Sequence, residues 1–172
     1  MIQLSYQAAL DPFHALFRLL RLWPILSKGP LPHETTRILD FYLLFPFRIG
    51  EIRIAKPHMR YKRIAKTYAH TKPYGEQPEG RAILNRMEPI QNAALNTLAA
   101  NGLIDANRLL LGEVRITDAP IPDDIAPRVN AANDSQADLM EFLGVLASDY
   151  KLLGPDGLKD RTGLLEYRYD PV

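Results

Sequence analysis

The sequence predicts a mostly helical α+β fold organised around a winged-helix-like segment, and three observations lead to that prediction. Apolar residues recur at three- and four-residue spacing over much of the chain, which is typical of amphipathic helices. Between residues 81 and 117 the pattern runs helix, turn, helix, turn and strand. The chain ends in a short alternating stretch. We therefore expect a single winged-helix-like domain over 1–172, with a helical part (1–70), a core (81–117) and a helical extension (121–172).

The N-terminal part predicts two helices. Asp11 followed by Pro12 is a typical helix start, because the acid caps the first turn and proline fits the first helical position. Arg18 and Arg21 should turn away from the buried face of this helix, which is expected to carry Phe13, Leu16, Phe17 and Leu20. A second helix from Pro32 to Phe45 is apolar around nearly its whole circumference, so it should be central to the core.

The predicted core begins after a loop. Residues 58–69 are basic and could form a helix with Met59, Ile64 and Tyr68 as core contacts, and 71–80 contain enough Pro and Gly to predict a flexible loop. A short helix over Arg81–Met87 and a second from Pro89 to Asn101 follow. The last part, Arg108–Thr117, is rich in Leu, Val and Ile and predicts a strand.

The C-terminal extension predicts one more helix and a strand. Prolines at 120, 122 and 127 mark a connector, and Ser135 is placed to cap a helix that reaches Tyr150. Gly154–Gly157 predicts a turn, and the alternation over Leu164–Tyr169 predicts a terminal strand.

The composition limits the classes of protein. With 172 residues, 47% of them hydrophobic, the chain can bury a core, and it has no cysteine for disulfides or thiolate metal sites. The longest apolar run, 39–47, is far shorter than the roughly 20 residues that a membrane span needs. The first eleven residues lack a basic start and an apolar signal core. We expect a cytoplasmic protein without membrane contact.

The motifs of catalysis are missing from the sequence. Neither a Gly-x-Ser-x-Gly elbow nor a Gly-Lys-Ser/Thr phosphate loop occurs. The four histidines lie in different predicted elements, without the spacing of metal ligands. The sequence therefore predicts no enzyme: no catalytic residue, no metal, no cofactor and no small-molecule substrate.

The net charge of +1 hides a strong asymmetry. Eight Lys and Arg residues fall within 48–72 against Glu51 alone, whereas seven Asp and Glu residues fall within 118–149 against Arg128 alone. Flexible cations of this kind bind phosphates, so the basic run is a candidate nucleic-acid site. Its candidate residues are Arg53, Lys56, Arg60, Lys62, Arg63, Lys66 and Lys72. Alternatively, the run is a helix face that pairs with the acidic half of the molecule.

One feature argues against sequence-specific recognition of DNA. The helix predicted to enter a major groove, 89–101, offers Gln91, Asn92 and Asn96 as base readers but carries no Lys or Arg. Without cations to anchor phosphates its affinity for DNA should be poor. The segment is better suited to bind protein.

Several stretches resemble a known family. Tyr6–Ala15, Phe17–Leu22 and Ile38–Phe47 are similar to the first fifty residues of the middle components of ABC-ATPase three-component systems, and Gly157–Leu164 resembles their C-terminal region. The resemblance implies an accessory subunit that works with an SMC- or Rad50-like ABC ATPase and a nuclease-type effector, as in Lamassu-type anti-phage defence. It also implies a winged-helix fold akin to the small subunits of SMC complexes.

Two functional hypotheses follow from these observations. In the first, the chain is a non-catalytic subunit that bridges the ATPase, the effector and the DNA backbone. In the second, it is a winged-helix transcription regulator, which predicts a dimer and tight binding to a short palindromic sequence.

Overall fold

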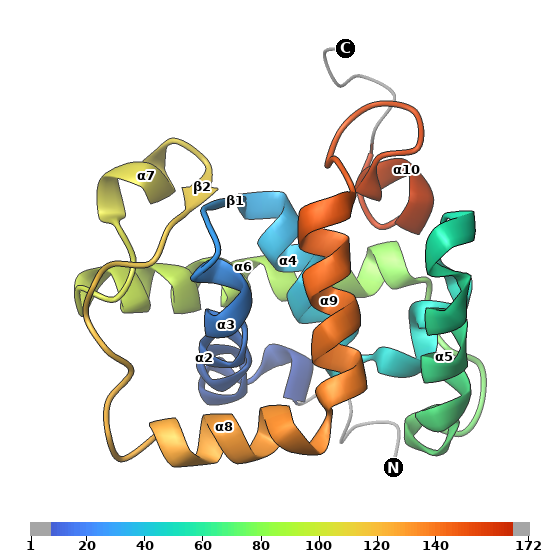
Figure 1. The fold of residues 1–172 in the computed structure, drawn as a ribbon, viewed down its shortest axis with the longest axis horizontal. Coiled ribbons are helices and arrows are strands. Elements are labelled where there is room, and N and C mark those ends of the chain that lie inside the picture. Colours follow the sequence, from blue (N-terminus) through green and yellow to red (C-terminus); the bar gives the residue numbers. More distant parts are fainter. Residues whose placement is uncertain (1–7, 167–172) are drawn as a thin grey trace.

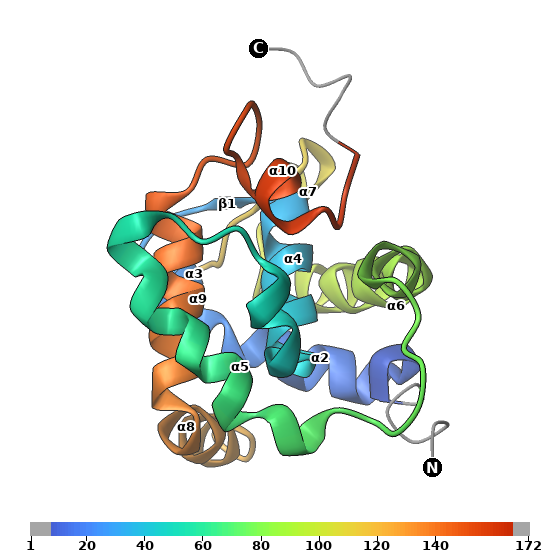
Figure 2. The same ribbon diagram turned by 90° about the vertical axis from the view of Figure 1, so that its right-hand side faces the viewer.

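The computed structural model describes residues 8–166, in which helices surround the central helix α4 (His33–Leu44). Figure 2 shows α4 between α9 (Ala137–Asp149) and α6 (Gly80–Ala100). Every residue from 35 to 43 is buried. The prediction of a central helix is confirmed, because a helix that is apolar on all sides can be stable only when it is surrounded.

Further helices and two short strands complete the mostly helical α+β fold (Figure 1). In chain order they are α2 (Pro12–Arg21), α3 (Trp23–Leu26), β1 (Leu31–Pro32), η1 (Pro46–Glu51), η2 (Lys56–Lys62), α5 (Arg63–Thr67), η3 (Ala69–Thr71), α7 (Ala106–Leu110), β2 (Glu113–Val114), α8 (Ala126–Ser135) and α10 (Leu158–Thr162). One hydrophobic core draws on residues from Ala9 to Leu165.

Helix α2 begins as predicted. The Asp11 carboxylate accepts hydrogen bonds from the backbone N–H groups of Phe13 at 2.8 Å and His14 at 3.2 Å. The predicted buried face is partly wrong: Phe13 is exposed, whereas Arg18 and Arg21 are buried. The reason is that each guanidinium finds polar partners inside the fold.

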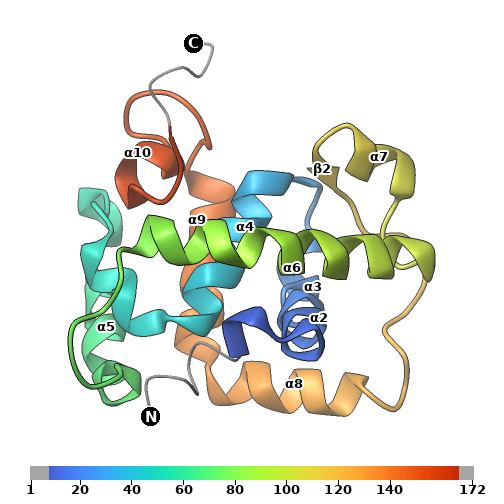
Figure 3. The same cartoon turned by 180° about the vertical axis from the view of Figure 1, so that it is seen from behind.

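The helix–turn–helix predicted within 81–117 is wrong, because 80–100 form the single helix α6 (Figure 3). Pro89 lies inside this helix, where proline ordinarily costs about 3 kcal/mol. Its position is exposed, so the backbone carbonyl left without a partner can be hydrated. The buried stripe of the helix continues across it from Met87 to Gln91 and Leu95, and this packing outweighs the local preference.

The predicted strand over 108–117 is mostly replaced by α7. Asp105 caps this helix by accepting from the N–H groups of Asn107 and Arg108, and the chain turns at Gly112, whose φ of +80° favours glycine. Strand β2 then pairs antiparallel with β1, with Leu31 opposite Val114. A further antiparallel bridge joins Ile104 to Ile116. The extended part is therefore confined to short pairings.

The C-terminal extension contains two long helices where one was predicted. Helix α8 ends at Ser135, and α9 begins after Gln136. Ser135 is not the cap that was expected: its hydroxyl donates to the Ala132 carbonyl within α8. Residues 164–166 are not a strand, and the rest of the predicted terminal strand lies outside the described residues. Within 8–166, no helix is both long and apolar enough to cross a membrane.

Candidate functional site

The candidate nucleic-acid residues lie in the basic segment, which we define as residues 48–72. It folds as short helical turns, η1 to η3, along one side of α9 (Figure 1). Ile64 and Tyr68 are buried, as predicted, whereas Met59 is exposed, contrary to the prediction. Tyr61 also anchors the segment, because its ring stacks on Phe142 of α9 with ring centres 4.8 Å apart.

Polar contacts fasten the basic segment to α9. Glu141 accepts a hydrogen bond from the Tyr61 hydroxyl at 2.6 Å and pairs with Arg60 at 3.2 Å. Tyr68 donates to Asp138 at 3.1 Å. Farther along the chain, Arg53 pairs with Asp160 of α10 at 2.5 Å. The acidic half of the molecule therefore engages part of the basic run.

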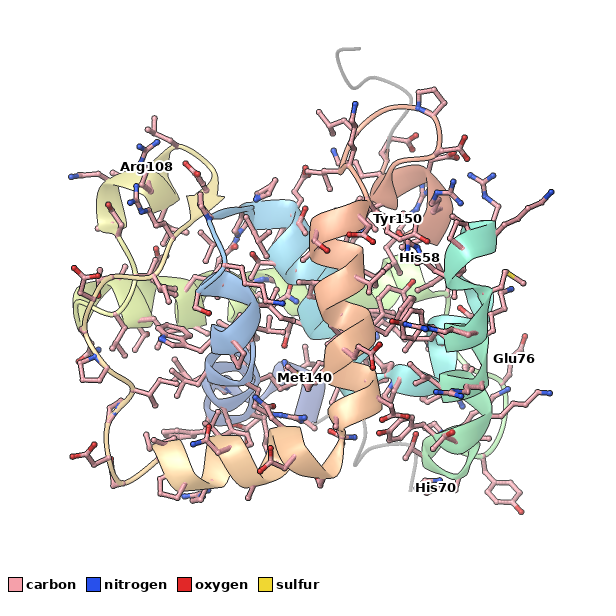
Figure 4. The ribbon with its side chains drawn as sticks, in the orientation of Figure 1. His58, His70, Glu76, Arg108, Met140 and Tyr150 are labelled. Carbon is pink, nitrogen blue, oxygen red and sulfur yellow. The ribbon has the colours of Figure 1, made fainter. Side chains whose placement is uncertain are left out.

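His58 also connects the basic segment to α9, at the C-terminal end of that helix. The Nδ1 atom of His58 lies 2.9 Å from the Tyr150 hydroxyl, and its Nε2 atom lies 3.2 Å from an Asp149 carboxylate oxygen. The Tyr150 hydroxyl also accepts from the Ala55 backbone N–H at 3.1 Å. Figure 4 shows His58 and Tyr150 side by side at this end of α9.

Two pKa shifts reflect these contacts. The hydrogen bond with Tyr61 raises the pKa of Arg60, with the charges of Tyr61 and Glu141 adding to the effect. Partial burial raises the pKa of Tyr68, and the neighbouring Asp138 carboxylate adds to the rise. Both groups therefore keep their protons throughout the physiological range.

Most of the remaining candidate cations extend into solvent. Lys62 donates to the Gly50 carbonyl at 3.4 Å. The side chains of the other four candidates are exposed and have no ion-pair or hydrogen-bond partner among residues 8–166. We call them the free cations, and they are Lys56, Arg63, Lys66 and Lys72. The seven candidate residues thus divide into cations engaged within the fold and cations available to a ligand.

A second group of cations is buried. The Arg18 guanidinium forms a two-pronged contact with Asp40 of α4, at 2.6 Å and 3.2 Å. Gln91 of α6 donates to the same carboxylate at 2.8 Å and accepts from Arg37 at 3.0 Å. This network joins α2, α4 and α6 in the interior. Its polar atoms have partners, as buried polar groups require.

Two further arginines support the surrounding elements. Arg21 donates to Asn133 at 2.9 Å and Gln136 at 2.8 Å, which ties α2 to the junction of α8 and α9. Burial lowers the pKa of Arg21 because it disfavours the charged form. Arg48 is buried too, and it donates to the Pro78 carbonyl at 2.8 Å and so braces the loop before α6.

The residues proposed to read DNA bases are mostly engaged elsewhere. Gln91 is buried in the network, so its prediction as a base reader is wrong. Asn92 lies 2.8 Å from the His33 Nε2 atom. Asn96 is exposed, at the edge of a cavity of about 290 Å³ that it lines with Leu95 and Leu110.

The tip that carries α7 is apolar and exposed. Leu110 is 86% exposed and Leu111 is 77% exposed. Arg108 of α7 pairs with Glu113 at 3.3 Å, and Figure 4 shows it at the opposite end of the molecule from His70. These two neighbouring leucines form a small exposed apolar patch that a protein partner could cover.

Metal binding finds no support in the described part of the chain. No three His, Asp or Glu side chains among residues 8–166 are close enough together to hold an ion. His33, His58 and His70 each lie beside a different partner.

Comparison with known protein families found a match over almost the whole chain. Residues 4–170 match the model of the ABC-three component (ABC-3C) system Middle Component 5. The chain belongs to this family. Membership confirms the resemblance to middle components predicted from the first fifty residues and the C-terminal stretch. No curated protein and no solved structure matches the chain.

Membership in the Middle Component 5 family indicates that some of the surfaces described above contact other proteins. A middle component is one of several parts of its system, which implies protein partners. The features that a partner could meet are the free cations and the leucine tip, formed by Leu110 and Leu111. Sequence reasoning identified the basic run but missed the leucine tip, because Arg108–Thr117 was expected to be a strand.

Proposed function

We propose that the chain is a non-catalytic, cytoplasmic accessory subunit of an ABC-3C anti-phage defence system, where it joins an SMC- or Rad50-like ATPase to a nuclease-type effector. Family membership supports a subunit role. The non-catalytic part agrees with the use of these buried polar groups, since Arg18 and Gln91 both donate to Asp40 and the three side chains serve to join helices in the interior.

We further propose that the free cations contact the DNA backbone in the assembled system. The observation that carries this step is the division of the basic run. Arg53 and Arg60 are paired with acids of α10 and α9, whereas Lys56, Arg63 and Lys66 extend into solvent without partners among the described residues. Exposed, unpaired cations on a fixed support suit phosphate contacts, which need no particular base sequence.

The winged-helix relationship is also part of the proposal, over residues different from those first predicted. Strand β1 lies between α3 and α4, pairs with β2, and the Ile104–Ile116 bridge extends that pairing. Helices α4 and α6 then take the helix–turn–helix positions, with 46–79 inserted between them. The exposed side of α6 contains a single free cation, Arg86. This composition favours protein contact over the alternative of a transcription regulator.

Reconstitution tests the subunit role. The chain is co-expressed with the other two components of its system, and the assembly is isolated by size exclusion with light scattering. We expect a stable complex of defined stoichiometry and no nucleotide or nucleic-acid turnover by the chain alone. A monomer that binds neither component, or turnover by the isolated chain, would contradict the proposal.

Charge reversal tests the DNA contact. Lys56, Arg63 and Lys66 are changed together to Glu, and binding of the assembly to a labelled 40-base-pair duplex is measured at low salt. We expect at least a tenfold loss of affinity, because each residue removes a phosphate contact and adds a repulsion. Arg86→Glu, on the exposed side of α6, is a single-site control; with assembly confirmed by size exclusion, it should leave DNA affinity within about twofold.

A further inference from the structure

Arg60 lies in line with two of the free cations but is paired with an acid. Three exposed cations follow one another at intervals of three residues from the end of η2 into α5, namely Arg60, Arg63 and Lys66. Side chains three residues apart lie on the same face of a 3₁₀ helix and are neighbours on an α-helix. The three cations therefore form one row, and Arg60 is its first member.

Two residues turn the Arg60 guanidinium toward α9. Its Nη2 atom donates to the Tyr61 hydroxyl at 2.8 Å and to a Glu141 carboxylate oxygen at 3.2 Å. The Tyr61 hydroxyl in turn donates to the same Glu141 oxygen at 2.6 Å. The guanidinium also lies over the Tyr61 ring, 4.8 Å from the ring centre. Contacts within the fold therefore orient Arg60, whereas Arg63 and Lys66 have no such contacts among the described residues.

The ion pair between Arg60 and Glu141 is exposed, so a ligand can reach it. The Arg60 side chain is 65% exposed and the Glu141 side chain is 58% exposed. A surface pair of this kind contributes little to stability, because water screens it. Phosphate and carboxylate bind a guanidinium in the same way, through charge-assisted hydrogen bonds. A DNA phosphate that approached Arg60 would therefore compete with Glu141 for the same group.

We propose that Glu141 withholds Arg60 from the DNA site by competing with phosphate for its guanidinium. The row then presents Arg63 and Lys66 to DNA, and its affinity is lower than three cations would give. This inference rests on the proposed DNA contact and adds a means of regulating it, because any change that separates Glu141 from Arg60 strengthens the contact.

Asp138 provides a matched control on the same side of α9. It lies about one turn before Glu141 and accepts a hydrogen bond from the Tyr68 hydroxyl at 3.1 Å, much as Glu141 accepts one from Tyr61. Its partners are the Tyr68 hydroxyl and the backbone N–H of Leu139, and no cation of residues 8–166 pairs with it. Neutralising Asp138 therefore removes an acid from beside the basic segment without freeing a cation.

Neutral variants that keep the hydrogen-bond acceptors test the proposal. Glu141→Gln and Asp138→Asn are made separately in the full chain, and binding of each assembly to a labelled 40-base-pair duplex is measured from 50 to 200 mM salt. We expect Glu141→Gln to raise affinity about fivefold at the lowest salt and to steepen the slope of log affinity against log salt by about one. Asp138→Asn should change affinity less than about twofold and leave the slope unchanged.

Substitution of the arginine shows whether the gain comes from Arg60 itself. In the wild-type background, Arg60→Gln should change DNA affinity less than about twofold, because Arg60 is withheld. In the Glu141→Gln background, the same substitution should abolish the gain in affinity and in slope. The two single variants and the double variant form a cycle, which separates release of Arg60 from the general effect of removing a negative charge.

Each other outcome overturns the proposal. Equal affinity and slope for Glu141→Gln and the wild type would show that Glu141 withholds nothing, although the DNA contact would stand. A loss of more than about threefold for Arg60→Gln alone would show that Arg60 already binds DNA. A gain by Glu141→Gln that persisted in the double variant would be an effect of charge alone. If neither the wild-type nor the Glu141→Gln assembly bound the duplex, the DNA contact itself would be wrong as well.

Discussion

The cations of the interior and those of the basic segment are alike in charge and opposite in use. Arg18 and Arg37 are buried. Arg18 donates to Asp40 and Arg37 donates to Gln91, so these cations serve to join helices. Arg63 and Lys66 stand in solvent without partners among the described residues. The comparison teaches that the number of cations in a segment does not indicate which of them can meet a ligand.

The residue types differ in a way that explains the division. Four of the five buried cations among residues 8–166 are arginines, namely Arg18, Arg21, Arg37 and Arg48, and the fifth is Lys159, which pairs with Glu34 of α4 at 3.0 Å. Three of the four free cations are lysines. A planar guanidinium can donate to several acceptors at fixed angles inside a protein, whereas the lysine ammonium is more strongly hydrated and more often stays at the surface; Lys159 is the exception here.

Removing the acid at the centre of the network should have the largest effect. Asp40→Ala leaves the Arg18 charge buried without its counter-ion, so we expect the free energy of unfolding to fall by about 3–5 kcal/mol. Urea denaturation followed by circular dichroism measures this. The double substitution Arg18→Met with Asp40→Leu removes both charges and should recover most of the loss. If Asp40→Ala lowered the free energy of unfolding by less than about 1 kcal/mol, the interior ion pair would be no more important for stability than a surface pair.

The interior should also respond to alkaline pH. Burial raises the pKa of Tyr42 far above its usual value of 10, and the nearby Glu51 charge adds to the rise. Because the folded state holds this proton more tightly, the stabilisation is complete below pH 10 and is lost as the pH rises further. Urea titrations from pH 8 to 11 should show a decline that is smaller in Tyr42→Phe. Identical slopes would show that Tyr42 contributes nothing to the decline.

Two substitutions within the basic segment compare an engaged residue with a free one, and their expected effects are smaller. Tyr61→Phe removes the 2.6 Å hydrogen bond to Glu141 and should lower the free energy of unfolding by about 1 kcal/mol, with DNA affinity of the assembly unchanged. Arg63→Ala should do the reverse, with stability unchanged and the salt slope of DNA binding reduced by about one. If both variants altered the same property, the division of the segment into engaged and free residues would be wrong.

The local parts of the fold were predictable because local chemistry decides them. Asp11 and Pro12 set the start of α2, and the apolar circumference of α4 required burial. The errors arose where tertiary contacts overrode local preference. Pro89 is tolerated within α6 because buried residues on either side of it pack against the core. Asp105 caps a helix in a segment that is rich in strand-forming residues.

The candidate site was predictable only as a region. Charge asymmetry identified both the basic segment and the acidic residues of α8 and α9, and the two proposed interpretations, phosphate binding and internal pairing, apply to different members of the same run. Which cations pair depends on how η2 and α5 are rotated against α9, and Tyr61 sets this by stacking on Phe142. That contact joins residues 81 positions apart in the sequence, and no local pattern indicates it.

The most direct test of the account is the salt dependence of DNA binding by the assembled system. Lys56, Arg63, Lys66 and Lys72 are all changed to Gln, and affinity for a duplex is measured between 50 and 200 mM salt. If the four free cations contact phosphates, the slope of log affinity against log salt should be about 3–4 smaller in magnitude than that of the wild type. Equal slopes would contradict the claim that the exposed cations are the ones that function.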